Sequence, residues 1–509
     1  MNLTKAESLN AHISTRIREI IDSDRFIEDS IILNEYANSL NGSVVLPKAI
    51  LFPVSKQEII QILKICKEEK LEIYPISRGK NWGYGSAQGT KQGQLILDLS
   101  KMNKVLEVDS ILCSMTLQPG VSQKEAYDFL QSKADYKNLQ LDVTGAGTEA
   151  SVVGNILERG FGHTDYGNRF DRIITMEVVL GNGTIIKTGF GAFENTNSEK
   201  TFKYGIGPCL EGLFSQSNFG IVTEMTIELM PKPEKFGLFV CSAKNEEDLG
   251  GLVEALRILR LETTINSTVH AANKNRAIGE KENSLVKTWT MAGSISGSRY
   301  LVKARKKRVK QVFKNKVPNC KVFFISDDLM KWVGILNNYK KIAAYIDLKY
   351  LVDIQKGIPT NVPLGIMINR KLGKNEPLKT NEFPLNFKWI PAVCRADEES
   401  AMKVISLMKT RFSEFGYEFR VTLTSINPRS LTFISNISFE KKTEEITKAN
   451  SFYLALMEDL YSNGFLPYRS GPGMFNVFKY RDKNVTDVLK DLKSLFDPDN
   501  VIAPGKYGI

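Results

Sequence analysis

Residues Gly145–Gly167 read GAGTEASVVGNILERGFGHTDYG, and this stretch decides the fold. It holds six glycines among 23 residues, too many for a regular helix or strand. Apolar residues stand inside the run, at Val152, Val153 and Ile156, which a long solvent-exposed loop explains poorly. Because a backbone without side chains can approach a ligand closely, the run predicts a segment pressed against a flat ligand or a pyrophosphate.

Four further glycine-rich segments accompany this run. The nearest, PISRGKNWGYGSA at 75–87, follows a predicted strand and suits either a structural turn or an anion-binding nest of backbone N–H groups. It matches neither a dinucleotide-binding GxGxxG turn nor a P-loop. The others are KYGIGPCLEGLFSQSNFGIV at 203–222, PYRSGPGM at 467–474 and FDPDNVIAPGKYG at 496–508.

The composition is that of a globular protein. The 509 residues are 42% hydrophobic and 25% charged, which excludes disorder and fibrous repeats and allows two or three domains. The polar N-terminus does not read as a secretory signal, and no apolar run is long enough for a membrane span, so we expect a cytoplasmic protein without a membrane partner. Six cysteines without a CxxC pair, and three histidines, favour free thiols over a metal site.

The net charge of +11 is diluted over the whole chain. One dense basic stretch, KARKKRVKQVFKNK at 303–316, is interpreted as the solvated face of a helix. No motif typical of nucleic-acid binding accompanies it, so nucleic acid is not an expected partner. Binding of an anionic cofactor or substrate explains this mild excess of positive charge better.

Short strands alternating with helices predict an α+β fold in four segments. Residues 1–42 form a helical N-terminal segment with one helix at 4–24, and 43–233 form the first part of a ligand-binding domain. A hairpin is expected at 176–188 because Gly181-Asn182-Gly183 separates two β-like runs. Residues 234–463, with few glycines, are predicted to be an inserted α/β cap, and 464–509 return to the first domain.

Together, the five glycine-rich segments resemble the vanillyl-alcohol oxidase/4-cresol dehydrogenase family of FAD flavoproteins. The resemblance covers about 45–232 and 464–509 strongly and the cap more weakly, and it rests on phrases such as SRGKNWGYG, GNILERGFGHTDYG and NVIAPGK. It implies a two-subdomain PCMH-type FAD-binding domain with the cap covering the isoalloxazine ring.

The resemblance also implies which residues hold FAD. The loop at 78–83 would bind the pyrophosphate through its N–H groups, Ile221 and Val222 would receive the adenine, and Lys506 would approach the pyrimidine side of the flavin. The cofactor-binding residues implied are Arg78, Gly79, Lys80, Asn81, Trp82, Gly83, Ser151, Gly154, Asn155, Gly160, Gly162, Tyr166, Gly167, Ile221, Val222 and Lys506.

For the substrate, the resemblance implies a para-substituted phenol bound as phenolate by Tyr84, Tyr468 and Arg469. Hydride would pass from the para side chain to flavin N5, with dehydrogenation, hydroxylation or oxidative decarboxylation as the outcome. Two other functions stay open. One is an FAD-dependent oxidase of a non-phenolic secondary-metabolite alcohol, amine or hydroxy acid, and the other is a flavin electron-transfer subunit.

Two departures from the family pattern affect the expected chemistry. The stretch at 428–439, where the family often attaches the flavin covalently, has neither His nor Tyr, and Asn81 replaces the attachment histidine of a related branch, so we expect non-covalent FAD. The family's aspartate near N5 falls at Gly145–Ala146, where no carboxylate stands. His163, with a pKa near neutrality, is the expected substitute base. The sequence leaves open the substrate, the electron acceptor and whether the chain forms a homo-oligomer.

Overall fold

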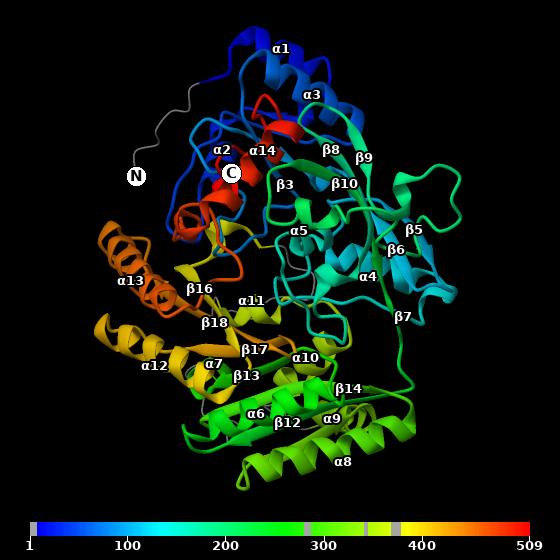
Figure 1. Cartoon of the computed structure of the whole chain (residues 1–509), viewed down its shortest axis with the longest axis vertical. Coiled ribbons are helices and arrows are strands. Elements are labelled where there is room, and N and C mark those ends of the chain that lie inside the picture. The colour runs from blue at the N-terminus through cyan, green and yellow to red at the C-terminus, as the bar shows by residue number, and fades with distance from the viewer. Residues whose placement is uncertain (1–7, 279–286, 340–344, 368–377) are drawn as a thin grey trace.

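The structure is a computed structural model that describes residues 8–278, 287–339, 345–367 and 378–509. Its strands form three main sheets and a two-stranded ribbon. Two of the main sheets belong to the glycine-rich parts of the sequence and lie at one end in Figure 1, and the largest sheet lies at the other end.

The first sheet has the order β1-β2-β4-β3; β2 and β3 are parallel to β4, whereas β1 is antiparallel to β2. These strands are almost wholly buried, as expected of short parallel strands covered by helices. Apolar side chains spaced along the helices, such as Ile17 and Ile59, complete its core. The elements are α1 (Ala11–Arg18), β1 (Phe26–Ile27), α2 (Ser30–Ala37), β2 (Ala49–Leu51), α3 (Lys56–Glu68), β3 (Ile73–Ile76) and β4 (Leu95–Asp98).

The second sheet is antiparallel, in the order β5-β6-β10-β8-β9. The predicted hairpin at 176–188 is present, because β8 pairs with β9 and Gly183 turns the chain at a φ of +84°. The elements of this part are β5 (Val105–Asp109), β6 (Ser114–Leu117), α4 (Gln123–Ser132), β7 (Leu139–Gln140), α5 (Val152–Leu157), β8 (Ile173–Leu180), β9 (Ile185–Lys187), β10 (Gly220–Glu228), β11 (Met230–Pro231) and the C-terminal α14 (Lys483–Phe496).

The third sheet has seven antiparallel strands in the order β15-β12-β14-β13-β17-β18-β16. It is formed by β12 (Lys235–Ala243), β13 (Val269–Asn273), β14 (Trp289–Gly297), β15 (Lys321–Ser326), β16 (Asn386–Arg395), β17 (Val421–Asn427) and β18 (Ser430–Phe439). The helices of this part are α6 (Asp248–Leu261), α7 (Lys274–Ile278), α8 (Arg299–Lys316), α9 (Asp327–Tyr339), α10 (Tyr345–Gln355), α11 (Val362–Met367), α12 (Glu398–Glu414) and α13 (Thr443–Ser462).

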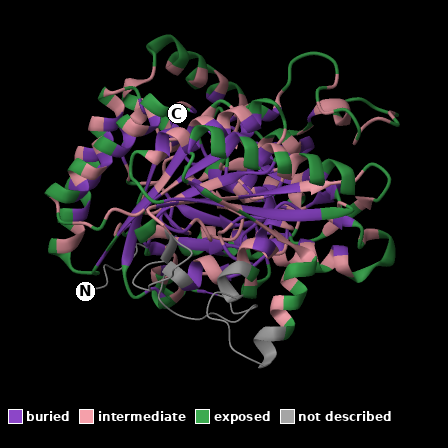
Figure 2. Ribbon diagram, turned by 90° about the horizontal axis from the view of Figure 1, so that it is seen from below, coloured by how far each residue is buried: buried purple, intermediate pink, exposed green. Residues whose placement is uncertain are grey.

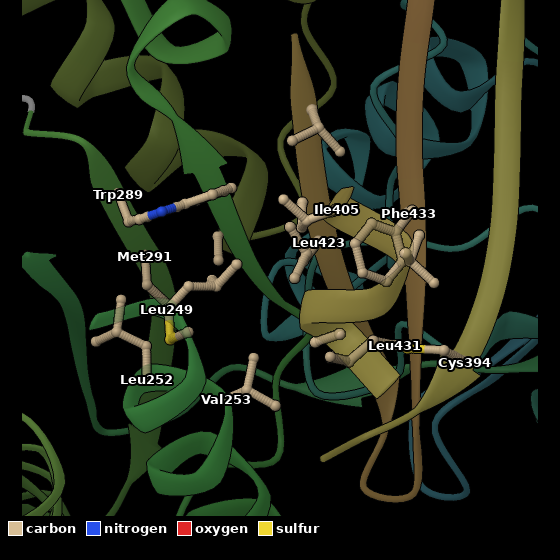
Figure 3. Packing of buried hydrophobic residues seen from close by; sticks show 14 of the residues in the cluster. Leu249, Leu252, Val253, Trp289, Met291, Cys394, Ile405, Leu423, Leu431 and Phe433 are labelled. Atoms are coloured by element: carbon tan, nitrogen blue, oxygen red, sulfur yellow. The ribbon is translucent and has the colours of Figure 1, made fainter. Parts of the chain in front are cut away.

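The seven-stranded sheet has two chemically different faces. On one face, Met291 and Leu423 pack with side chains of α6 and α12 in the largest apolar core (Figure 3). Strand residues alternate between faces, so their neighbours point the other way. Those neighbours include Ala292 and Thr424, which line a cavity. Seen from below, the buried strands run through the molecule with more exposed helices around them (Figure 2).

Some sequence predictions of local structure were wrong. The helix expected at 4–24 is described only from residue 8, and within that part it spans only Ala11–Arg18. Helix α2 adds a second helix to the N-terminal segment, for which the sequence predicts only one. Strand β13 was missed because its sequence, VHAAN, carries few of the β-branched and aromatic residues that mark strands.

The basic stretch at 303–316 lies on α8, where its lysines are mainly exposed and Val309 and Phe313 are buried, as the sequence predicts. Of the six free cysteines, four are buried, whereas Cys113 is half-buried and Cys209 is exposed. Across the described residues, no helix combines the length and apolarity that a membrane span requires.

Candidate active site

A cavity of about 2440 Å³ lies between the two smaller sheets and the second face of the seven-stranded sheet. Its lining includes the loop after β3, the glycine-rich run around α5, the start of β10, the segments at 468–469 and 502–506, and strands β13, β14 and β17. Single-ligand pockets typically measure ~300–1,000 Å³. The volume therefore accommodates a large cofactor together with a substrate.

The loop at 78–83 follows β3 and reaches into this cavity. Gly79 has a φ of +63°, and a Cβ there would meet Ala87 at 2.7 Å, so the turn requires glycine. Arg78 turns away to Glu125 and Glu149, and Lys80 Nζ donates to the carbonyl of Leu378. The charged side chains are thus engaged by the protein. This leaves the backbone of the loop as the group offered to an anion.

The glycine-rich run places α5 at the cavity wall, next to the strand end that carries the 78–83 loop. Ser151 caps α5 by accepting from the N–H of Gly154, and Gly154 packs against Ser77 so closely that a Cβ would lie 2.8 Å from its Oγ. Asn155 and Gly160 line the cavity as well. The two glycine-rich segments predicted from the sequence thus face one ligand-sized space.

Four predicted cofactor residues do not line the cavity. A Cβ on Gly162 would overlap Asp142, and one on Gly167 would overlap Thr268, so these glycines permit close chain packing. Gly83 packs in the same way against Phe387 and Trp389, and Tyr166 lies beneath the Arg172 guanidinium. For these four residues the structure provides a packing role, and their placement does not support contact with a cofactor. The other predicted cofactor residues all line the cavity.

Lys506 lines the cavity near Tyr74 and is not a surface lysine. Its Nζ lies 3.0 Å from Glu158 Oε1, and its side chain is 18% exposed. Burial lowers the pKa of Lys506, but the charge of Glu158 outweighs burial and raises it above its usual value. Tyr507 also hydrogen-bonds to Glu158. A permanently protonated ammonium group is therefore available at this wall of the cavity.

Tyr84, Tyr468 and Arg469 come together from segments almost 400 residues apart in the sequence. The Arg469 guanidinium lies 4.3 Å from the centre of the Tyr84 ring, and its Nη2 donates to Asn81 Oδ1 at 2.5 Å. Burial, reinforced by Tyr468, raises the pKa of Tyr84 well above its usual value, so this hydroxyl stays a proton donor. Arg469 Nε is shielded from solvent and has no hydrogen-bond partner in the described structure.

His163 also lines the cavity, and it forms a hydrogen-bonded pair with His270, a residue that sequence reasoning dismissed. His163 Nδ1 and His270 Nε2 are 2.8 Å apart, and His270 Nδ1 lies 3.1 Å from Thr424 Oγ1. The Phe161 ring connects this pair to the tyrosine site, with its centre 6.1 Å from both His270 and Tyr468. A prediction that β13 is a strand with alternate residues facing the cavity would have identified His270.

Both histidines are neutral at neutral pH. Burial lowers the pKa of His163 well below its usual value, with further lowering by His270 and Arg169, and burial lowers the pKa of His270 to about 4. The sequence prediction of a pKa near neutrality for His163 is therefore wrong. It neglected desolvation, which disfavours a buried imidazolium.

The chain from Thr424 through His270 to His163 has two consistent arrangements of protons. In one, Thr424 donates to His270 and His270 donates to His163, which leaves a proton on His163 Nε2. In the other, every donor and acceptor is reversed, and His163 Nε2 becomes an acceptor. This series of hydrogen bonds therefore lets His163 Nε2 act as either a base or an acid in the cavity without a change in net charge.

The comparisons with known proteins agree with this geometry. A family profile described as "FAD binding domain" matches residues 47–189. The chain is 29% identical over 515 residues to the 4-cresol dehydrogenase [hydroxylating] flavoprotein subunit of Pseudomonas putida, covering 96% of this chain and 92% of that protein. It is 27% identical to 1'-carboxy-chondrochloren decarboxylase of Chondromyces crocatus, with 90% of each chain covered.

Solved structures give the same result. A p-cresol methylhydroxylase structure with bound substrate matches with a TM-score of 0.86 and 26% identity, over 98% of this chain and 96% of that chain. The 4-ethylphenol oxidase of Gulosibacter chungangensis shares the fold with a TM-score of 0.88 at 21% identity, over 99% of each chain.

The fold, the cavity and these similarities define an FAD-dependent oxidoreductase. The resemblance to the vanillyl-alcohol oxidase/4-cresol dehydrogenase family, with its PCMH-type FAD-binding domain, is confirmed. The α+β fold expected from the sequence is confirmed, and so is FAD as the cofactor.

Proposed function

We propose that this enzyme oxidises a para-substituted phenol, bound as its phenolate between Arg469, Tyr84 and Tyr468. The observation that carries the proposal is Arg469 Nε, a buried donor without a partner, in a guanidinium that faces the cavity beside two tyrosines. Buried polar groups are nearly always hydrogen-bonded, so this donor indicates a missing acceptor. A phenolate oxygen has the required charge and size.

The residues of this cluster would activate the phenol. A fixed cation and two hydroxyl donors stabilise the anion relative to the neutral phenol and so lower the pKa of the substrate. Deprotonation raises the electron density of the ring at the para position, which eases the loss of hydride from the side-chain carbon attached there. When bound, FAD supplies the hydride acceptor.

His163 is proposed as the base of this site. A Cβ added to Gly145 would lie 3.8 Å from His163 Nε2, so the imidazole stands beside the backbone position where the family resemblance expects an aspartate. Glu149, an alternative base, is engaged by Arg78 at 2.6 Å. In the arrangement with a proton on Nδ1, His163 Nε2 would accept a proton from the substrate while His270 and Thr424 hold the ring.

The names of the relatives suggest two outcomes for the oxidised side chain. One relative is a hydroxylating dehydrogenase and another is a decarboxylase. Which outcome applies here depends on the side chain that the substrate carries. A carrier of electrons without its own substrate is disfavoured by the large cavity floor built from the seven-stranded sheet.

Anaerobic mixing with paired substrates tests this function. We expect 4-ethylphenol or a related para-alkyl phenol to bleach the oxidised flavin band, whereas its methyl ether, which cannot ionise, should not. Equal bleaching by the phenol and the ether would overturn phenolate activation. Bleaching only by aryl alcohols or hydroxy acids would support the non-phenolic alternative.

A further inference from the structure

Arg276 lies in the cavity, away from the phenolate site, on α7 directly after β13. Its position is fixed by Asn273, whose Oδ1 accepts from the N–H groups of both Arg276 and Val421, each at 3.1 Å. Asn273 is itself buried and donates to the carbonyl of Phe419. The turn that carries Arg276 is therefore anchored to the neighbouring strand β17.

The guanidinium of Arg276 has neutral neighbours. Nη1 donates to Asn436 Oδ1 at 2.7 Å, and the group lies 5.6 Å from the Trp389 ring centre. No carboxylate among the described residues forms an ion pair with it, and the nearby Arg420 adds repulsion. Burial lowers the pKa of Arg276 to about 10, so the group is still charged at neutral pH.

A partly buried cation without a counter-ion is costly, because the protein does not replace the water that it excludes. The other cations in the lining differ in this respect. Arg78, Arg420 and Lys506 each have a carboxylate partner, and Arg469 has the phenolate proposed above. Lys80 donates to the carbonyl of Leu378 and belongs to the loop expected to bind the pyrophosphate, an anion. Arg276 is thus the cavity cation whose charge nothing in the described residues or in the proposed reaction balances.

The cavity floor between His270 and Arg276 is formed by strands of the seven-stranded sheet. Its residues are small, including Ala272 on β13 and, on the neighbouring strands, Thr290, Ala292 and Thr422. With a rise of about 3.3 Å per strand residue, the backbone from His270 to the end of β13 spans about 10 Å. A substrate chain can therefore run along this floor from the reacting carbon to Arg276.

From these observations, and on the basis of the proposed function, we infer that Arg276 and Asn436 form an anion subsite for a carboxylate at the far end of the phenolic substrate's side chain. The planar fork of arginine suits the two oxygens of a carboxylate, and Asn436 holds that fork in place. The substrate class is then a para-hydroxyphenyl compound with an acidic side chain, larger than a simple alkyl phenol.

The test compares an acidic and a neutral phenol of matched length, 8-(4-hydroxyphenyl)octanoate and 4-octylphenol, in anaerobic flavin reduction. In Arg276→Gln, the ratio of reduction efficiency for the acid to that for the neutral phenol should fall about 10- to 100-fold, the usual effect of losing a hydrogen bond to a charged group. Arg276→Lys should fall between Gln and wild type. Arg420→Gln is the matched control, because Glu418 already pairs that arginine, and its ratio should change less than threefold.

A second measurement separates this inference from the proposed function. Binding of 8-phenyloctanoate, which has no phenol, is followed by perturbation of the flavin spectrum in the same variants. If no phenol bleaches the flavin but this binding weakens in Arg276→Gln, the proposed function fails and the subsite stands. If phenols bleach the flavin while neither the ratio nor the binding responds to Arg276→Gln, the subsite is overturned.

Discussion

At the scale of single residues, the candidate active site is marked by polar groups whose hydrogen bonds the described protein residues do not complete. Arg469 presents a donor without an acceptor, and His163 presents a ring nitrogen whose role depends on its neighbours. Such groups are costly in a folded core unless a ligand completes them. Substitutions at these positions should therefore change catalysis more than folding.

Arg469→Ala should slow flavin reduction by a phenol, and Tyr84→Phe should do so in the same sense. Losing a contact to a buried oxyanion costs about 2–4 kcal/mol, which corresponds to roughly 30- to 1,000-fold in the reduction rate. FAD content should stay near that of wild type, which the absorbance ratio of flavin to protein reports. A loss below threefold in both variants would count against phenolate binding here.

His163→Phe should slow reduction roughly 100-fold or more, the usual contribution of a general base. Because the pKa of His163 is lowered well below 6.5, the base is active at neutral pH and is lost on acidification. The reduction rate of wild type should therefore fall only below the ordinary histidine range near pH 6.5. Stopped-flow rates across pH should show this limb in wild type, and a limb that persists in the variant would assign it to another group.

His270→Gln probes the positioning partner. A glutamine amide can still bond to His163, through either its oxygen or its NH2 group, but it cannot take up a proton at one atom and release one at another as an imidazole does. We expect reduction at neutral pH to slow about tenfold, less than in His163→Phe, with the acid limb displaced because His270 contributes to the pKa shift of His163. An unchanged pH profile would make His270 a packing residue.

At the scale of elements, a buried lysine is central to how the C-terminal segment packs on the molecule. Lys493 on α14 donates to the carbonyls of Asn218 and Ile502 and to Asp497, which is 1% exposed. Asp497 in turn accepts from the N–H groups of Val501 and Ile502. This cluster sets the position of the cavity wall at 502–506.

Lys493→Ala should lower the free energy of unfolding by about 3–5 kcal/mol, because it leaves the buried Asp497 carboxylate unpaired. Urea denaturation measures the change. Lys490→Ala, an exposed lysine on the same helix, should stay within about 0.5 kcal/mol of wild type. Similar values for the two variants would contradict the role of Lys493.

How much the sequence predicted differs between elements. Local signals were sufficient for α8 and for the hairpin at Gly183, since the spacing of polar and apolar residues and turn chemistry act over a few residues. The resemblance brought together Tyr84 and Arg469, whose contact no local pattern encodes. His270 was not predicted as a site residue. The composition of β13 is not typical of a strand, and this strand is stabilised by pairing with β14 and β17.

At the scale of the whole molecule, the cavity joins two remote glycine-rich segments to the cap sheet. Because the wall at Ile221 and Val222 is distant in sequence from the loop at 78–83, a ligand that spans both should stabilise the fold more than one that reaches a single side. By the resemblance, FAD would contact both, with its adenine at Ile221 and Val222 and its pyrophosphate at the loop.

FAD should therefore raise Tm in proportion to the logarithm of its concentration, by an amount equivalent to ~2.7 kcal/mol at 100-fold excess over Kd, and FMN should raise it less. Acid precipitation should release the flavin into the supernatant, because residues 428–439 contain no histidine or tyrosine. A flavin-sized mass addition on the denatured chain would refute non-covalent binding, and His163 would be the first attachment site to examine.

The two faces of the seven-stranded sheet have a consequence for how this enzyme diversifies. Met291 and Leu423 maintain the core, whereas their strand neighbours Ala292 and Thr422 only shape the space above it. Mutations at the second set can remodel what the enzyme accepts while the framework persists. Within each strand, the residues that shape the substrate space are therefore different from those that stabilise the fold. Libraries for new substrates are best confined to alternate positions of β13, β14 and β17.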